Sequence, residues 1–229
     1  VLRIYERRLQ LFSMSEVLNS YSKFIMPLVF SYDMLVNRNR RLSEDFKPES
    51  LILPQIPFDS SAAPDDPKRM LESEAAHAAE SLFIQSRHDG LHLYGVSGYR
   101  TYSRQNELFS RNPETIYVAP PGGSEHQTGL ALDVSCPALS LDLTEEFALT
   151  LEGRWLTKNA PLFGFILRYP KGKENITGYA YEPWHIRYVT RSLALYLTLT
   201  GLTLEEYHSL RLPDEDSEDY GCAASSEPF

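Results

Sequence analysis

Residues 124–133 read Ser-Glu-His-Gln-Thr-Gly-Leu-Ala-Leu-Asp and lead from a polar loop into an apolar run. A buried strand is predicted over 130–134, because the run is short, apolar and preceded by a turn residue. Asp133 lies seven positions after His126, and on a straight strand an odd spacing points two side chains to opposite faces. Both can face one cavity only if the chain bends between them, and Gly129 supplies the freedom for that bend.

A second segment, Glu182-Pro183-Trp184-His185, follows later in the chain. Pro183 disfavours a helix, so we expect a tight turn that feeds a strand over 186–189. Together the two segments offer two imidazoles, one carboxylate and one further acid. A catalytic zinc needs three protein ligands, an open position for water and a nearby proton acceptor, and the two segments can supply that set. The other four histidines (His77, His88, His92 and His208) have no such surroundings and are expected to be ordinary core or surface residues.

Composition limits the classes of protein to consider. The 229 residues, 42% of them hydrophobic, suit one domain with extra elements, or at most two small ones. A formal charge of −9 argues against a nucleic-acid partner. The longest apolar stretch, residues 24–30, is too short for a membrane span and contains a proline. An export signal or anchor upstream of Val1 stays open, and the oligomeric state is not predicted.

Hydrophobic periodicity predicts short strands between helices. Strands are expected over 34–37, 91–97, 130–134, 165–169 and 186–189. Helices are expected over 71–87, 103–109 with Ser103 as its cap, from Thr144 onward with Phe147, Leu151 and Trp155 inward, over 193–199 and over 204–207. Residues 43–70 are predicted to be a long loop with a few extended pieces. This order indicates an α+β fold with a small, mostly antiparallel sheet, flanking helices and a metal cleft on the sheet.

Three parts are expected along the chain: a helical arm over 1–33, a catalytic domain over 34–212 and an acidic tail over 213–229. The tail is interpreted as solvated, with docking onto the basic N-terminal arm as the alternative. Cys136 and Cys222 are not in a metal-binding spacing. They are either two free thiols or a disulfide that pins the tail to the core of an exported protein.

The sequence resembles the VanY-type D-alanyl-D-alanine carboxypeptidases, zinc peptidases of peptidoglycan that also include LD-carboxypeptidases. The resemblance covers roughly residues 34–210. It is carried by Ser97-Gly98-Tyr99-Arg100, Gln105, Ser124-x-His126-x-x-Gly129-x-Ala131-x-Asp133, the run from Gly164 to Pro170, Lys173, Ile176 to Tyr179, and Glu182-Pro183-Trp184-His185 through Val189.

The resemblance implies a role for each residue of the motifs. His126, Asp133 and His185 would bind Zn²⁺, and Glu182 would be the general base that moves a proton from water to the leaving amine. Arg100 would recognise the terminal carboxylate of the substrate, since a guanidinium does so bidentately; the alternative for Arg100 is a surface salt bridge. Further substrate contacts are expected from Gln105, Ser124, Tyr181 and Trp184.

The implied substrate is a peptidoglycan stem peptide, met outside the cytoplasm or at the surface of a bacterium. Hydrolysis of the terminal D-Ala-D-Ala bond is the leading hypothesis. An LD-carboxypeptidase that trims the tetrapeptide would use the same ligands, and an endopeptidase would conflict with a pocket closed by Arg100. A non-catalytic wall-binding module of the same fold is the alternative from another class; it would usually have lost a ligand or the base, and all four residues are present.

Overall fold

The computed structural model describes residues 31–113 and 115–210, and the described part from Tyr32 onward is one compact unit. Its centre is a four-stranded antiparallel sheet in the order β3-β4-β6-β5. The strands are β3 (Tyr94–Ser97), β4 (Ala131–Ser135), β6 (His185–Tyr188) and β5 (Phe165–Leu167). Two further strands, β1 (Leu51–Ile52) and β2 (Leu71–Glu72), pair with each other. The predicted α+β class with a small antiparallel sheet is confirmed.

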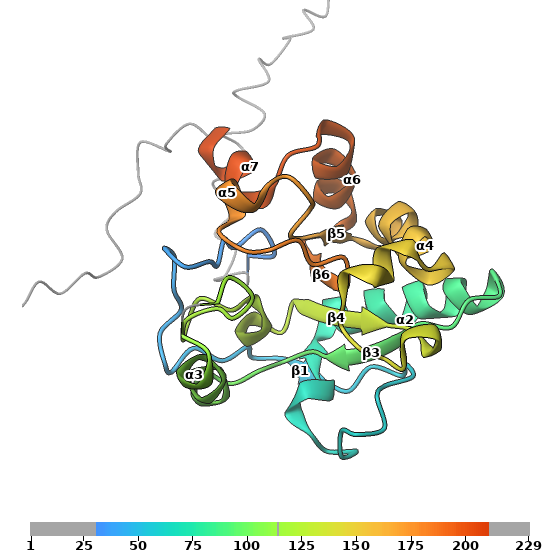
Figure 1. The fold of residues 1–229 in the computed structure, drawn as a ribbon, viewed down its shortest axis with the longest axis horizontal. Coiled ribbons are helices and arrows are strands. Elements are labelled where there is room, and N and C mark those ends of the chain that lie inside the picture. Colours follow the sequence, from blue (N-terminus) through green and yellow to red (C-terminus); the bar gives the residue numbers. More distant parts are fainter. Residues whose placement is uncertain (1–30, 114, 211–229) are drawn as a thin grey trace, which may run out of the picture. The chain divides into compact units, whose positions relative to one another are not determined.

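Helices flank this sheet (Figure 1). They are α2 (Ser73–His88), α3 (Tyr102–Arg111), α4 (Leu151–Asn159), α5 (Glu174–Thr177), α6 (Arg191–Thr200) and α7 (Leu204–Leu210). The longest, α2, buries a face of small and large apolar residues that includes Ala75, Ala79 and Phe83, as its periodicity predicts. None of the helices in the described ranges combines the length and the hydropathy needed to cross a bilayer.

The core runs along both sides of the central strands. All five residues of β4 are buried, which explains its nearly continuous apolar sequence. One core cluster joins β5 and the end of β6 to α6 and α7; its buried members are Ile166, Val189, Ala194, Leu197 and Leu204. The rigid centre of the sheet, β4 beside β6, is therefore where the two sequence motifs meet.

Several sequence-based expectations are corrected by the structure. The helix expected over 71–87 begins at Ser73, because Leu71 and Glu72 pair with β1 as strand β2. Residues 34–37 do not form a strand; the Asn37 side chain accepts from the backbone N–H of Asn39 and Arg40 and makes a local turn. The cap of α3 is Thr101, whose hydroxyl accepts from the N–H of Arg104, and not Ser103.

The helix expected from Thr144 is two elements. A 3-10 helix over Glu145–Leu149 ends at Thr150, whose hydroxyl caps the separate helix α4. Phe147 is fully buried as expected, Trp155 is half-buried, and Leu151 is 71% exposed. The break lies at Thr150, whose backbone is extended, and Gly153 permits the close packing of the two segments, because a Cβ there would overlap the carbonyl of Phe147.

The predicted arm over 1–33 and tail over 213–229 lie outside the described residues, apart from 31–33. Cys136 is a buried free thiol, whereas Cys222 falls in the part not described, so the state of that residue stays a prediction.

Candidate active site

His126 lies in a short 3-10 helix, Glu125–Thr128, directly before β4. This helix ends at Gly129, which has a φ of 69°, the left-handed conformation that glycine adopts without strain. A side chain at Gly129 would also lie within 2.9 Å of the backbone N of Glu72. The bend predicted between His126 and Asp133 is therefore present, and Gly129 makes it.

The His126 ring is held in one orientation. Its Nδ1 lies 2.7 Å from the carbonyl oxygen of Gly98, to which it donates, leaving Nε2 directed at Asp133 Oδ2, 3.2 Å away. Gly98 can bring its carbonyl so close because it has no Cβ; one built there would lie 2.5 Å from Met70 O. A carbonyl partner of this kind fixes the tautomer of a metal-binding histidine.

Asp133 and His185 are direct neighbours across β4 and β6. The turn at Glu182 is present as predicted and is closed by a bond from His185 N–H to Glu182 O. The strand β6 begins at His185 and ends at Tyr188, one residue earlier at each end than the predicted 186–189. His185 Nδ1 lies 2.9 Å from Asp133 Oδ1. Burial opposes protonation of His185, but the carboxylates of Asp133 and Glu125 outweigh it and raise the pKa of the imidazole to about 9.

Glu182 is buried beside this cluster, with its Oε2 3.9 Å from His185 Nδ1. Burial raises the pKa of Glu182 to about 7, with a smaller contribution from Asp133, while His185 and Arg100 act in the opposite direction. A carboxyl group with a pKa near neutrality suits a general base that later acts as an acid.

Arg100 reaches the same cavity from the segment after β3. Its guanidinium donates to Gln105 Oε1 at 2.9 Å and to Ser97 Oγ at 3.0 Å. Gln105 is in turn fixed by a bond from its Nε2 to the carbonyl of Ala119. Burial lowers the pKa of Arg100, and the negative charges of Asp133 and Glu182 oppose that shift. The partners of Arg100 are neutral, so its charge is left for a ligand.

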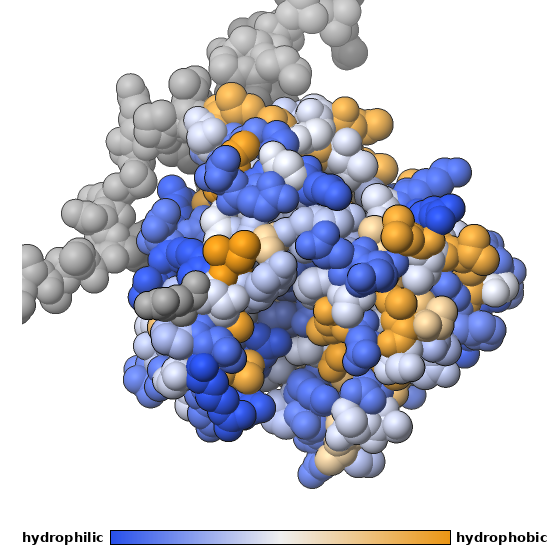
Figure 2. Space-filling model, in the orientation of Figure 1, coloured by the Kyte–Doolittle hydropathy of each residue, from blue (hydrophilic) through white to orange (hydrophobic). Residues whose placement is uncertain are grey.

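These side chains line a cavity of about 720 Å³, and Figure 2 shows the surface hollowed near the middle of this face. Ser124 and Trp184, two of the residues expected to contact substrate, are among its lining residues. Gln105 and Tyr181 are not among the residues that line the cavity. Gln105 accepts a hydrogen bond from Arg100, and the Tyr181 ring lies 5.9 Å from Lys171 Nζ. The tyrosines in the lining are Tyr117, Tyr169 and Tyr179.

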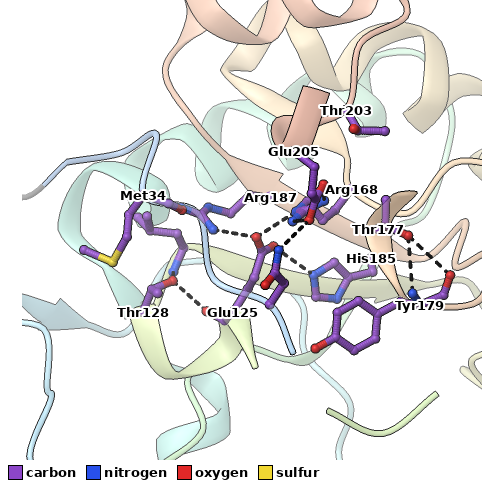
Figure 3. A network of polar contacts seen from close by, with 12 residues as sticks. Met34, Glu125, Thr128, Arg168, Thr177, Tyr179, His185, Arg187, Thr203 and Glu205 are labelled. Carbon is purple, nitrogen blue, oxygen red and sulfur yellow. Dashed lines mark hydrogen bonds and ion pairs between the residues drawn. The ribbon is translucent and has the colours of Figure 1, made fainter. Parts of the chain in front are cut away.

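A second polar cluster lies behind His185, and no pattern in the sequence predicts it. We call it the buried charge network; it consists of Glu125, Arg168, Arg187 and Glu205 (Figure 3). Glu125 Oε1 accepts from Arg168 Nε and from Arg187 Nη1, both at 2.7 Å. Although burial opposes ionisation, these two guanidinium groups hold the pKa of Glu125 well below its usual range. The position of Glu125 next to His126 was the one available hint.

His126, Asp133 and His185 fit a metal ion. Their ligand atoms lie within 4.8 Å of one another, and all three side chains are buried. Two imidazoles and a carboxylate are a donor set used by catalytic zinc, which leaves a position open. His126 Nε2 and His185 Nδ1 both face Asp133, so each ring presents one nitrogen to the centre of the cluster.

The fold and this geometry define a class: an α+β domain with three clustered side chains that could hold a metal ion, a buried acid beside them and the guanidinium group of Arg100 in the same cavity. The family model described as D-alanyl-D-alanine carboxypeptidase, VanY, matches residues 68–191. The chain belongs to the VanY family.

Individual relatives agree. The Bacillus subtilis protein YodJ is 42% identical over 180 residues, which are 76% of this chain and 65% of YodJ. The chain thus spans slightly less than two thirds of the length of that relative. The structure of the LdcB LD-carboxypeptidase superposes with a TM-score of 0.72 and 42% identity, covering 76% of this chain and 84% of LdcB. The D,D-pentapeptidase VanY of a VanB-type resistance cassette, solved with Zn(II), gives 0.61 and 32%, covering 78% and 99%.

Proposed function

We propose that this protein is a zinc-dependent carboxypeptidase that removes the terminal D-alanine from peptidoglycan stem peptides by hydrolysing the D-Ala-D-Ala bond. The observation that carries the proposal is one cavity lined by three clustered side chains that could hold a metal ion, by a buried carboxyl group whose pKa burial raises to about 7, and by a guanidinium group. A carboxypeptidase needs these three parts together: a metal, a base and a group that recognises a free carboxylate.

His126 Nε2, His185 Nδ1 and a carboxylate oxygen of Asp133 would hold the zinc. When bound, zinc supplies a Lewis-acidic centre that acidifies water and polarises a carbonyl group. Glu182 accepts the proton of the attacking water and then donates it to the amine of the departing D-alanine. Because Glu182 is buried and close to His185, that proton is kept next to the reacting atoms.

Arg100 pairs with the terminal carboxylate of the peptide. Its side chain is pre-oriented by Gln105 and Ser97, so less conformational entropy is lost on binding. Ser124 and Trp184, from the two motif segments, complete the contacts with the last residues of the substrate. Tyr169 and Tyr179 take the place in the cavity wall that Tyr181 was expected to occupy.

An LD-carboxypeptidase that trims the tetrapeptide is the second candidate. The likeness to the LdcB LD-carboxypeptidase, with a TM-score of 0.72, is higher than that to the D,D-pentapeptidase, with 0.61. The metal cluster and the base are equally suited to both bonds. Either activity places the work of the enzyme outside the cytoplasmic membrane, where mature peptidoglycan lies.

Mass spectrometry of the products from a stem pentapeptide and a stem tetrapeptide, with and without a chelator, tests the proposal. Loss of one D-alanine from the pentapeptide, abolished by the chelator and restored by zinc, is the expected result. Cleavage of the tetrapeptide alone assigns the LD activity instead. An enzyme that releases D-alanine from neither peptide when loaded with zinc contradicts both candidates.

A further inference from the structure

Glu125 and His185 face each other across the back of the cluster (Figure 3). Glu125 Oε2 and His185 Nε2 lie 3.6 Å apart, just beyond hydrogen-bond distance. Neither atom has a hydrogen-bond partner within the described ranges, and both are buried. A buried donor and a buried acceptor without other partners are costly, and a shift of a few tenths of an ångström would pair them.

The other oxygen of Glu125 cannot compete for this role. Oε1 already accepts from Arg168 and Arg187. Arg168 is itself clamped by Glu205 of α7, with Nη1 at 2.8 Å and Nη2 at 2.6 Å from its two oxygens. Arg187 donates through Nη2 to the carbonyls of Tyr32 and Met34. The carboxylate is thus held in one rotation, with Oε2 aimed at His185.

Strand geometry places these groups on one side of β6. Residues two apart on a strand point to the same face, so His185 and Arg187 both project toward Glu125. The two positive charges of Arg168 and Arg187 balance the two negative charges of Glu125 and Glu205. Charge pairing accounts for the contacts of Glu125 Oε1, but among the described residues it leaves Oε2 without a hydrogen-bond partner and facing only His185 Nε2.

We propose that Glu125 is a positioning residue of the metal site: it accepts the Nε2–H of His185 and so keeps the Nδ1 lone pair of that ring available to the metal. This rests on the proposed zinc site. An imidazole that binds a metal through one nitrogen carries its proton on the other, and a carboxylate partner fixes that tautomer and raises the basicity of the ligand. Gly98 O does the same for His126.

The substitution Glu125→Gln separates positioning from charge pairing. Two guanidinium groups hold the oxygen side of the amide, so the amide NH₂ faces His185 Nε2. A donor facing that nitrogen favours the tautomer with the proton on Nδ1, which blocks the ligand atom. We expect zinc affinity, measured by competition with a chromophoric chelator at fixed pH, to fall about 10- to 100-fold.

The matched control is Glu205→Gln. It removes a charge from the same network but leaves Glu125, Arg187 and His185 in contact, so zinc affinity should stay close to the wild-type value even if stability falls. Urea unfolding of both variants shows whether their losses of stability are comparable. Equal weakening of zinc binding by both variants would mean a purely structural role and overturn the proposal.

Two further measurements keep the test decisive. In ¹⁵N–¹H spectra of the zinc-loaded chain, the Nε2–H signal of His185 should be present in the wild type and in Glu205→Gln, and lost in Glu125→Gln. If Glu125→Gln does not fold, Glu125→Asp keeps the charge but cannot span from both arginines to His185, and it should also weaken zinc binding. Wild-type affinity in a folded variant at position 125 overturns this inference alone, whereas a wild-type chain that binds no zinc overturns the proposed function with it.

Discussion

The cavity and the buried charge network are adjacent, but charged groups are paired within the network and left without charged hydrogen-bond partners in the case of Arg100 in the cavity. In the network, two carboxylates and two guanidinium groups pair at 2.6 to 2.8 Å and balance one another. In the cavity, Asp133 and Glu182 face a single arginine, Arg100, whose hydrogen bonds go to neutral partners. The charges of the network balance one another within the protein, whereas the cavity is suited to receive a cation and an anionic peptide end. We therefore expect a break in the ion pairs of the network to affect mainly folding, apart from the proposed effect of Glu125 on His185, and changes in the cavity to affect turnover.

The largest effect is expected for Glu182→Gln. The amide keeps the shape of the side chain but cannot accept a proton from water, so kcat/KM should fall by about 10²- to 10⁴-fold. Release of D-alanine from a stem peptide measures the loss. Zinc content and thermal stability should stay at wild-type levels, because Glu182 is not one of the three ligand residues. Turnover that is unchanged would remove Glu182 from its assigned role.

For the network, Arg168→Met should destabilise the fold by about 3–5 kcal/mol, because Glu125 and Glu205 would be left buried with one partner fewer. Urea denaturation of the metal-free chain measures this. The matched control is Lys173→Met. It breaks a half-exposed ion pair to Glu206, which lies next to Glu205 on α7, and should lower the free energy of unfolding by less than about 1 kcal/mol. Equal costs for the two variants would contradict the distinction between buried and exposed pairs.

Arg100→Lys should lower kcat/KM about 10- to 100-fold, as expected for the loss of one charged, bidentate contact, with little change in stability. A peptide with an amidated C-terminus supplies the control. The wild type should discriminate strongly against the amide, and the variant should discriminate much less. If the wild type and the variant discriminate equally against the amidated peptide, Arg100 does not recognise the terminal carboxylate.

The smallest effect is expected when the pH is varied and kcat/KM of the wild-type enzyme is measured. A base must be ionised to accept a proton, so activity should fall as the pH drops through the pKa of Glu182. The protein alone raises that pKa from 4.5 to about 7, and the positive charge of a bound metal favours the ionised form. The acid limb of kcat/KM is therefore expected between these two values. A limb that persists unchanged in the residual activity of Glu182→Gln would assign it to another group.

Part of this comparison could be predicted from the sequence. The motif residues His126, Asp133 and His185 come together because Gly129 and Pro183 dictate local bends, and such bends can be read from the chain. The positions of the four central strands followed from short apolar runs. The α+β class followed from the same pattern.

The network could not be predicted, because its contacts join residues far apart in sequence. Glu125 meets Arg168 and Arg187 across 43 and 62 residues, and no periodicity marks such pairs. The tyrosines that line the cavity could not be predicted for a similar reason. Tyr181 and Tyr179 lie on an irregular segment, where alternation does not tell which side chain turns inward.

The central claim is that the cavity holds zinc through three residues and keeps a position open. Anomalous diffraction at the zinc edge, from crystals of the full chain grown with zinc, tests it most directly. The account predicts a peak bonded to His126 Nε2, His185 Nδ1 and Asp133, with no fourth protein ligand. A peak at other residues, a fourth protein ligand or no peak in the cavity would contradict it.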